Sequence, residues 1–502
     1  MSEVIVIGAG LGGLACAAKL ARTGRNVLLF EENPHLGGTS YIFKRGPYAF
    51  PMGPLSFSYP ARVKAILEEL KTGAPADFKR NHYQLIAPGL DIVYSRPLKI
   101  VQEDLIRFFP PEAEGIRAVI SALQRIIASR GLRPLRSGLP QGILSRRAKE
   151  TRKTAWNQTF PGAEELASPS QKFLEQHISS PVLRNFLGSQ GTEEPEMSLL
   201  SLARMWNFVS EVGVWFPSGG IHGLADRLHA SFLASGGKTR LGTAVKEILV
   251  ENGKAVGVRT ASGECIRSEW VVSNADAKRT FLEMISPRHV PPNYLDKVRS
   301  TPYTDSGLCV YLGIDPLKVD FSRMSTNHAF FRKCLSPVEG TGLEDFGNRD
   351  IEICLWSQNM PDSAPAGKAA LLLRVSFPYD YFGRWRTGEK RRAEGYGAYK
   401  EGLARKLIQN VESFLPGLGR SVEVMEVATP LTYQDWGNRT QGSIAGWTWA
   451  AEQAGAFGQN LLGQTPLERL LLCGIYSVTE LFWGGLPTAL TTGLWAAERV
   501  LA

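Results

Sequence analysis

The 502-residue sequence lacks the residue patterns that mark several large classes of protein. Its six cysteines are scattered and contain no CxxC pair, which indicates neither a disulfide framework nor a zinc site and favours a reducing compartment. Its seven histidines are dispersed, and the sequence shows no Ser-His-Asp arrangement. We therefore expect no metal site and no hydrolase triad.

Long apolar runs are also missing. The N-terminal run at residues 4–18 follows Glu3, where a secretory signal peptide would need positive charge. The uncharged stretch at residues 481–497 is interrupted by Gly484, Gly485, Pro487 and three threonines. It falls short of the roughly 20 apolar residues that a spanning helix needs. We expect no spanning helix and a cytoplasmic protein.

The basic charge of the chain is concentrated in one segment. Residues 111–160 hold ten basic and three acidic residues, so they carry +7 of the net charge of +9. No nucleic-acid recognition module accompanies this charge, and we expect no nucleic-acid partner. Six residues recur there at helical spacing: Ile116, Val119, Ile120, Leu123, Ile126 and Ile127. Two interpretations stay open: a helix lying on an anionic membrane surface, or a helix packed on the core with a solvated basic face.

The N-terminus predicts a nucleotide-binding βαβ unit. A β-branched run at residues 4–7 is followed by Gly8-Ala9-Gly10-Leu11-Gly12-Gly13, a helix to about Arg22 and a second strand that ends at Glu31. Gly8 permits a tight turn, Gly10 lets a pyrophosphate approach the backbone, and Gly13 lets the helix pack on the strand. Glu31 follows Gly8 by 23 residues, close to the spacing of a ribose-binding acid.

Later segments predict more of the same domain. Residues 241–258 are typical of a hairpin that turns at Asn252-Gly253, while residues 270–272 and 470–474 are typical of short buried strands. A helix is expected over residues 488–501. The fold class is therefore α/β, a Rossmann-type nucleotide-binding domain with an interleaved α+β substrate domain. The expected nucleotide-binding segments are 1–84, 213–290 and 456–502, and the expected substrate-domain segments are 85–212 and 291–455.

A second glycine pair, Gly37-Gly38, follows Glu31 by six residues and suggests a cofactor longer than a nicotinamide dinucleotide. Here the sequence resembles the phytoene desaturase, carotenoid isomerase and retinol saturase flavoproteins of the amine-oxidase-like superfamily. The likeness extends to residues 213–220, to residues 241–280 and to two C-terminal motifs, Leu472-Cys473-Gly474 and Gly484-Gly485-Leu486-Pro487. It implies FAD as the cofactor. The residues expected at FAD are Gly8, Gly10, Gly12, Gly13, Glu31, Glu32, Gly37, Gly38, Thr39, Gly53, Pro54, Val245, Asn274, Gly474, Gly485, Leu486 and Pro487.

Three positions depart from the pattern of these relatives. Thr39 stands where desaturases often carry Arg, whereas the isomerase and saturase branches tend to have a small residue. Pro51 stands where relatives usually have Asp, and Ile475 stands where many of these flavoproteins have an Asp near the ribityl chain. FAD binding is expected to survive these changes, but they weaken the desaturase interpretation.

Few residues are candidates for acid–base chemistry. Glu480 lies in the extended loop between Gly474 and Gly484, where apolar neighbours would raise its pKa. Alternatively, it is a solvated loop carboxylate. His222 is either near the cofactor or a surface residue. Four aromatic residues either line an apolar tunnel or fill a core: Tyr476, Trp483, Trp447 and Trp449.

Three functions follow as hypotheses. The first is an FAD-dependent oxidoreductase that acts on carbon–carbon bonds of a hydrophobic, isoprenoid or carotenoid-like substrate, with a quinone or oxygen as electron acceptor. The second is a flavin-dependent cis–trans isomerase of polyenes without net redox change, which Thr39 favours. The third is a prenyl-lipid escort that binds no flavin. Because polyenes dissolve in membranes, the resemblance also favours peripheral contact with an inner membrane face.

Overall fold

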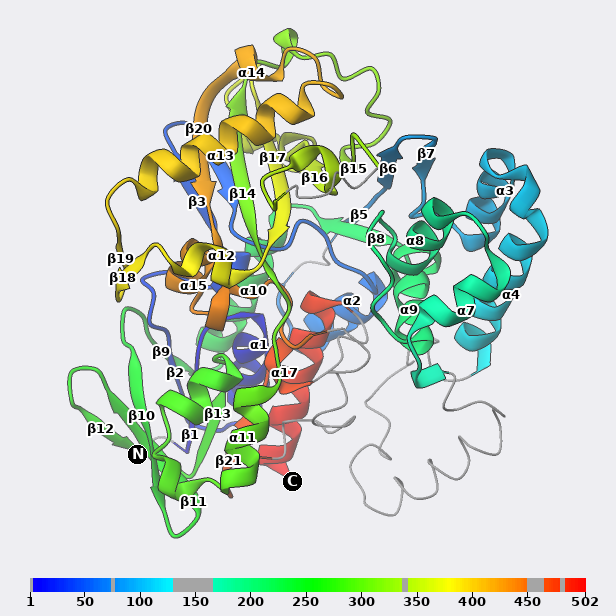
Figure 1. The fold of residues 1–502 in the computed structure, drawn as a ribbon. Coiled ribbons are helices and arrows are strands. Elements are labelled where there is room, and N and C mark those ends of the chain that lie inside the picture. Colours follow the sequence, from blue (N-terminus) through cyan, green and yellow to red (C-terminus); the bar gives the residue numbers. More distant parts are fainter. Residues whose placement is uncertain (1–2, 74–76, 130–165, 336–341, 449–464, 479–483) are drawn as a thin grey trace.

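The computed structural model describes residues 3–73, 77–129, 166–335, 342–448, 465–478 and 484–502. Within these residues, two large sheets and a group of helices form the main bodies of the molecule (Figure 1). Both termini lie at the end of the molecule that holds the parallel sheet (Figure 1).

The parallel sheet is built from three stretches of chain that are far apart in the sequence. Its strands, in spatial order, are β21 (Leu470–Leu472), β13 (Trp270–Ser273), β1 (Val4–Ile7), β2 (Val27–Phe30) and β9 (Lys238–Arg240). The residues of β1, β2 and β21 are buried throughout, as short apolar strands covered on both faces require.

Each face of this sheet has its own cover. Val4 and Val6 of β1 point into the core formed with α1 (Leu11–Arg22), α10 (Gly220–Ala234) and α17 (Gly485–Leu501). The alternate residues Ile5 and Ile7 face an antiparallel sheet on the other side. That sheet consists of β10 (Val245–Glu251), β11 (Lys254–Thr260) and β12 (Cys265–Arg267). Three layers result, and the carboxyl ends of the parallel strands stay free for a site.

Two sequence predictions can be compared with this region. The predicted hairpin is confirmed, because β10 and β11 pair antiparallel about Asn252 and Gly253, both at positive φ (49° and 75°). The predicted C-terminal helix begins at Gly485, three residues earlier than expected. Pro487 is tolerated there because the first turn of a helix needs no backbone N–H at that position.

A seven-stranded mixed sheet forms the second body. Its strands, in order, are β20 (Val422–Ala428), β14 (Ser306–Ile314), β17 (Ala369–Phe377), β16 (Ile351–Cys354), β15 (His328–Phe331), β6 (Tyr83–Ala87) and β7 (Leu90–Val93). One face packs on α13 (Tyr396–Val411) through a large apolar core. The other face turns toward the parallel-sheet domain, and residues such as Cys309 and Tyr311 join the core around α1.

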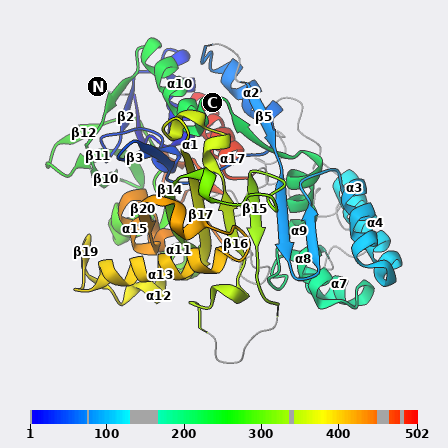
Figure 2. The same ribbon diagram turned by 90° about the horizontal axis from the view of Figure 1, so that it is seen from above.

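Helices gather beside β6 and β7 at one edge of that sheet (Figure 2). They are α3 (Leu98–Phe108), α4 (Ala113–Ser129), α7 (Ser170–His177), α8 (Pro181–Ser189) and α9 (Leu199–Trp206). The apolar stripe of α4 is turned into this helical core: Ile116, Val119, Ile120 and Leu123 have no exposed surface.

The burial of α4 corrects one sequence interpretation. Side chains that are enclosed by the protein's own core cannot insert into a membrane interface, so the interfacial-helix interpretation of residues 116–123 is wrong. The core-packed alternative describes this helix. The basic residues from Arg130 to Lys153 lie outside the described residues. Within the described ranges, no helix is both long and apolar enough to cross a membrane.

Shorter elements complete the chain. They are β3 (Ile42–Arg45) with β4 (Tyr48–Pro51), β5 (Phe78–Asn81) with β8 (Val214–Pro217), β18 (Arg386–Gly388) with β19 (Arg391–Arg392), and the helices α2 (Pro60–Glu69), α11 (Pro292–Ser300), α12 (Tyr379–Gly383), α14 (Leu418–Ser421) and α15 (Pro430–Gly437).

Candidate functional site

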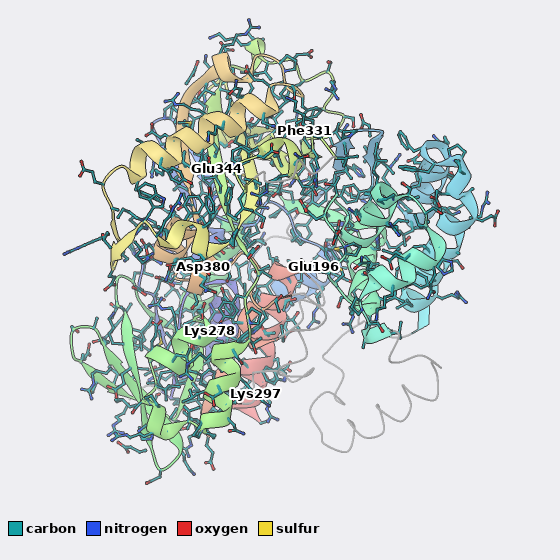
Figure 3. All side chains as sticks on the ribbon, viewed as in Figure 1. Glu196, Lys278, Lys297, Phe331, Glu344 and Asp380 are labelled. Atoms are coloured by element: carbon teal, nitrogen blue, oxygen red, sulfur yellow. The ribbon has the colours of Figure 1, made fainter. Side chains whose placement is uncertain are left out.

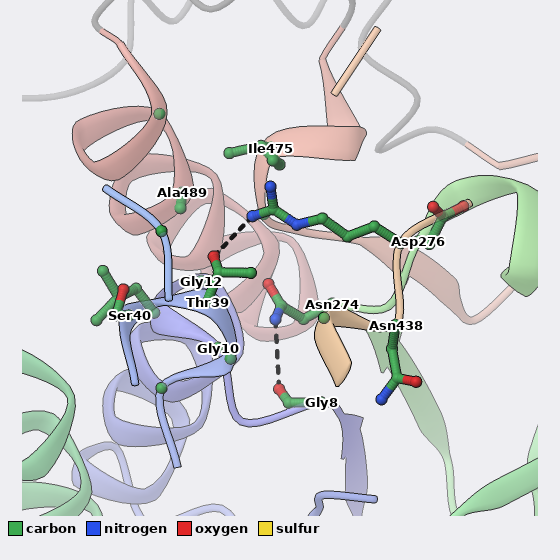
Figure 4. Close-up of a pocket in the computed structure, with 18 of the residues that line it drawn as sticks. Gly8, Gly10, Gly12, Thr39, Ser40, Asn274, Asp276, Asn438, Ile475 and Ala489 are labelled. Atoms are coloured by element: carbon green, nitrogen blue, oxygen red, sulfur yellow. Dashed lines mark hydrogen bonds between the residues drawn. The ribbon is translucent and has the colours of Figure 1, made fainter. Parts of the chain in front are cut away.

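A large pocket lies at the carboxyl ends of the parallel strands, where ligands of open α/β sheets bind (Figure 4). The turn after β1 and the end of β2 form one part of its wall. Residues 437–439 and the first turn of α17 form another part. Residues of the seven-stranded sheet also line the pocket.

The glycine turn is shaped so that side chains would not fit. Gly8 has a φ of 93°, and a Cβ on Gly10 would lie 2.8 Å from Nδ2 of Asn274. A Cβ on Gly13 would overlap the carbonyl oxygen of Gly8. Gly37, also at positive φ, donates its N–H to the carbonyl oxygen of Ala9 (2.9 Å), which brings the second glycine pair against the first. The result is a backbone surface open to a ligand.

Two helices begin at this pocket. The N-cap of α1 is Gly10 and that of α17 is Gly484, and no side chain in the described part of the chain caps either helix. The first-turn N–H groups of both helices therefore keep donor capacity, and the positive ends of their dipoles favour negative charge. Gly485 and Leu486 of α17 line the pocket itself.

The acid at the end of β2 is held in place by its neighbours. Glu31 is 6% exposed, and its carboxylate accepts hydrogen bonds from the N–H of Ala9 (2.8 Å) and from the N–H and side-chain amide of Asn33 (2.9 and 3.0 Å). Next to it, Glu32 lies 3.5 Å from the guanidinium of Arg279. Both acids line the pocket, where a ribose hydroxyl could donate to Glu31.

Most residues expected at a cofactor meet in this one pocket. Its wall includes Gly8, Gly10, Gly12, Glu31, Glu32, Gly37, Gly38, Thr39, Gly53, Pro54, Val245, Asn274, Gly474, Gly485 and Leu486. Gly13 and Pro487 lie just behind that wall, in the first turns of α1 and α17. Their contact with a cofactor stays a prediction for each residue.

The acid–base candidates are distributed differently. Glu480, Trp449 and Trp483 lie outside the described residues. His222 lies in the first turn of α10 and is not among the described residues that line the pocket; burial lowers its pKa.

Tyr476 lines the pocket, but it is packed tightly. Burial, followed by the charge of Asp276, raises its pKa. Its hydroxyl contacts that of Ser443 (2.9 Å), and its carbonyl oxygen accepts a hydrogen bond from Nε1 of Trp447 (3.0 Å). Tyr476 is therefore a packed residue of the pocket wall, and Trp447 lies in the core behind it.

Sequence reasoning missed the contribution of residues 437–445. Arg439 reaches across the pocket and donates from Nη2 to Oγ1 of Thr39 (2.7 Å). Its loop is anchored by Asp276, whose Oδ2 accepts the N–H of Thr440 (2.8 Å) and whose Oδ1 accepts the hydroxyl of Tyr303 (2.9 Å). The positive charge of Arg439 therefore lies beside Thr39, which occupies the position where desaturases of similar sequence often carry Arg.

Sequence reasoning also missed polar residues on the seven-stranded sheet. Tyr83, Glu352 and Arg374 line the end of the pocket away from the glycine turn, together with Tyr433 of α15. Among the described residues, no group of three or more His, Cys, Asp or Glu side chains is arranged to hold a metal ion. The single charges in the strands IEIC and AALLLRVSF were the signal that could have found Glu352 and Arg374.

The donor set fits a dinucleotide with a further ring system. Three features support this fit: the glycine turn, whose open backbone surface a Cβ would obstruct, the buried carboxylate of Glu31, and the two helix N-termini without a side-chain cap.

Known proteins resemble the chain over nearly its whole length. The chain is 25% identical over 524 residues to the all-trans-retinol 13,14-reductase of Danio rerio, and the aligned region covers 98% of this chain and 85% of that protein. It is 26% identical over 525 residues to the chloroplastic prolycopene isomerase of Daucus carota, and the aligned region covers 100% of this chain and 80% of that protein. An oxidoreductase from Methanosarcina mazei shares the fold with a TM-score of 0.64 at 18% identity, over 99% of both chains.

A family model is matched along almost the entire sequence. The model described as flavin containing amine oxidoreductase matches residues 11–501. That match spans the helix of the glycine turn, the seven-stranded sheet and α17. The chain therefore belongs to the family of flavin containing amine oxidoreductases, and its cofactor is FAD.

Proposed function

We propose that the chain oxidises or reduces a carbon–carbon bond of a long hydrophobic substrate, of isoprenoid or carotenoid-like type. The observation that carries this proposal is the continuity of one pocket from the glycine turn to the face of the seven-stranded sheet. The wall of this pocket also includes apolar side chains, among them Met52, Leu55 and Ile444. When bound, FAD supplies hydride acceptor or donor chemistry, which needs an oriented substrate more than a protein nucleophile.

The chain's own residues hold the cofactor in this proposal. The N–H groups at the start of α1, beside Gly10 and Gly12, bind the pyrophosphate, and Glu31 accepts the hydroxyls of the adenosine ribose. The backbone at Val245 meets the adenine, as the family resemblance implies. The first turn of α17, at Gly485 and Leu486, would hold the flavin through its N–H groups.

Lipid analysis of expressing cells tests the proposed reaction. Cells that produce candidate polyenes are compared with and without the chain, and with a Glu31→Ala variant as a matched control that lacks the ribose contact. We expect a product that differs from the polyene by two hydrogens only with the wild-type chain. Equal product in all three cultures would contradict the proposal. A quinone or oxygen is the proposed electron acceptor.

A second candidate is cis–trans isomerisation of a polyene without net redox change. Thr39, a small residue after the glycine pair, favours it, and the relative from Daucus carota is named a prolycopene isomerase. An isomerase forms a product with the mass of its substrate and a different chromatographic retention. A product that differs by two hydrogens rejects this candidate. A non-catalytic escort without flavin is not supported, since the cofactor of the chain is FAD.

We also propose a cytoplasmic enzyme that contacts an anionic membrane surface peripherally. The support is the net charge of +7 in residues 111–160. Because the apolar stripe of α4 is buried, α4 can contribute to this membrane contact only through its charges.

A further inference from the structure

Two charged residues of the seven-stranded sheet, Glu352 and Arg374, are each the single charge of an otherwise apolar strand. Glu352 lies between Ile351 and Ile353 on β16, and Arg374 lies between Leu373 and Val375 on β17. These four neighbours belong to the core beneath α13. Since side chains alternate along a strand, the two charges point to the opposite face, where they line the pocket.

Glu352 and Arg374 are register partners and form a buried ion pair. Nε and Nη2 of Arg374 both contact Oε2 of Glu352, while Nε2 of His328 donates to Oε1 (2.7 Å). Burial raises the pKa of Glu352, but the charge of Arg374 and the hydrogen bond from His328 hold it at about 2. Glu352 therefore stays ionised near neutral pH.

Stability alone gives a weak reason for this pair. Desolvation of two charges costs about as much as their attraction returns, and apolar residues of similar volume are often as stable. The pair also leaves donor capacity unused. The third nitrogen of the Arg374 guanidinium, Nη1, has no hydrogen-bond partner among the described residues, and the side chain is 23% exposed at the pocket.

The surroundings of Arg374 suit an oxygen atom without charge. The charges of Glu352 and Arg374 cancel, so the pair offers no net positive charge to an anionic ligand. A ligand carboxylate placed here would also be repelled by the like charge of Glu352. Hydroxyl groups complete the wall: Tyr433, and Tyr83 in hydrogen-bond contact with Ser56. Burial raises the pKa of both tyrosines, which therefore remain neutral hydroxyls. The adjoining wall at Met52 and Leu55 is apolar.

We propose that this polar end of the pocket binds the hydroxyl or carbonyl oxygen of an otherwise apolar ligand, with Arg374 as the donor. The inference rests on the proposed function and narrows its substrate class from hydrocarbons to polyene alcohols, aldehydes or ketones. The same chemistry suits the carbonyl of an isoprenoid quinone. A pure hydrocarbon would leave Nη1 of Arg374 desolvated and without an acceptor, which lowers its affinity.

Equilibrium binding to the FAD-loaded protein tests the proposal without turnover. The probes share one chain length: a polyene hydrocarbon, its terminal alcohol, aldehyde and carboxylate, and a quinone with a comparable isoprenoid tail. Ligand fluorescence and the perturbation of the flavin absorption band report binding. We expect the alcohol and aldehyde to bind about tenfold more tightly than the hydrocarbon, the usual size of a hydrogen bond to a charged group.

Two variants assign the preference to Arg374. The double change Glu352→Gln with Arg374→Met removes both charges and keeps a partner for His328, so it avoids a lone buried charge. Arg374→Lys keeps the cation beside Glu352 but loses the planar fork, and it remains usable if the double variant does not fold. Both should reduce the alcohol preference to less than threefold. Arg386→Lys is the matched control, because Arg386 is similarly exposed (21%) and pairs with Asp435 outside the described pocket wall.

The outcomes separate this inference from the proposed function. Equal binding of alcohol and hydrocarbon, tighter binding of the carboxylate, or a preference that survives in both Arg374 variants would overturn it, even if a carbon–carbon bond is still converted. A clear alcohol preference without any conversion would instead contradict the proposed function. If only the quinone shows the preference, the oxygen site belongs to the electron acceptor. Failure of every probe to bind contradicts both.

Discussion

Nη2 of Arg439 donates a hydrogen bond to Oγ1 of Thr39 at 2.7 Å, although the two residues are 400 positions apart in the sequence. Arg439 also donates to the carbonyl oxygens of Ser443 and Ile444, so three acceptors fix its guanidinium inside the pocket. A loop of the second body thus places a positive charge against the glycine-lined site.

The position of Arg439 predicts a role in FAD affinity. Arg439→Met should weaken FAD binding by about tenfold, since a charge-assisted contact to an electron-rich cofactor is lost. Thr39→Val, which removes only the hydroxyl, should have a smaller effect in the same direction. Titration of apoprotein with FAD measures both. Arg323→Met is the control, because Arg323 bonds the carbonyl oxygen of Ser413 away from the described pocket wall. Equal affinity of the Arg439 and Arg323 variants would contradict this role.

Two helical glycines should respond in opposite ways to alanine. Gly13→Ala places a methyl group into the carbonyl of Gly8, and we expect the free energy of unfolding to fall by about 1–3 kcal/mol. A Cβ on Gly223, in the first turn of α10, would meet no described atom within 4 Å beyond its chain neighbours and the backbone of its own helix. Gly223→Ala should leave stability unchanged or raise it by up to about 1 kcal/mol. Urea denaturation compares them, and equal destabilisation would show that the close approach of α1 to β1 is unimportant.

The loop around Glu344 predicts a pH dependence of stability. Glu344 lies beside α13 (Figure 3) and accepts hydrogen bonds from Lys406 (2.6 Å), Tyr381 (2.7 Å) and Tyr399 (2.9 Å). Burial raises its pKa, but these three donors lower it from 4.5 to about 2. Its folded pKa is depressed, so its stabilisation is complete above pH 4.5 and is lost as the pH falls toward 2.

Denaturation at several pH values measures this contribution. The gap in stability between wild type and Glu344→Gln should be constant above about pH 5 and should shrink below pH 4.5. Glu389→Gln, at an exposed turn position, controls for the change in net charge. A gap that widens as the pH falls would contradict the assignment.

Vesicle binding tests the basic segment. The charge of +7 in residues 111–160 predicts co-sedimentation with anionic vesicles, with about 1 kcal/mol for each basic residue near the surface. Since the apolar stripe of α4 is buried, salt should reverse this binding almost completely as the Debye length falls to about 3 Å at 1 M. Changing Arg146, Arg147, Arg152 and Lys153 together to Ser should weaken it and leave the flavin spectrum intact. Equal recovery of both proteins in the soluble fraction would show that the segment is only a solvated surface.

The sequence predicted features that short-range physics determines. The glycine turn, the acid at Glu31 and the hairpin at Asn252 each depend on neighbouring residues, because φ, turn type and strand length are local properties. The three-segment parallel sheet follows from short apolar strands that must be covered on both faces.

Long-range packing decided what the sequence alone left open. No local pattern brings Arg439 to Thr39, since that contact depends on how residues 437–445 cross the pocket. The side of α4 that faces the core was likewise undecided, because an amphipathic stripe suits a membrane and a protein core equally. By contrast, Glu352 and Arg374 could have been found as lone charges within strand-like apolar runs.

A single-turnover experiment in the absence of oxygen shows whether this pocket performs carbon–carbon redox chemistry. FAD-loaded protein is mixed with a polyene alcohol, once with the flavin oxidised and once with it reduced, and the flavin absorbance and the product mass are recorded together. We predict that one of these two mixtures changes the flavin redox state in proportion to a product that has lost or gained two hydrogens. A product of unchanged mass with an unchanged flavin spectrum, in both mixtures, would contradict the claim that this pocket performs carbon–carbon redox chemistry.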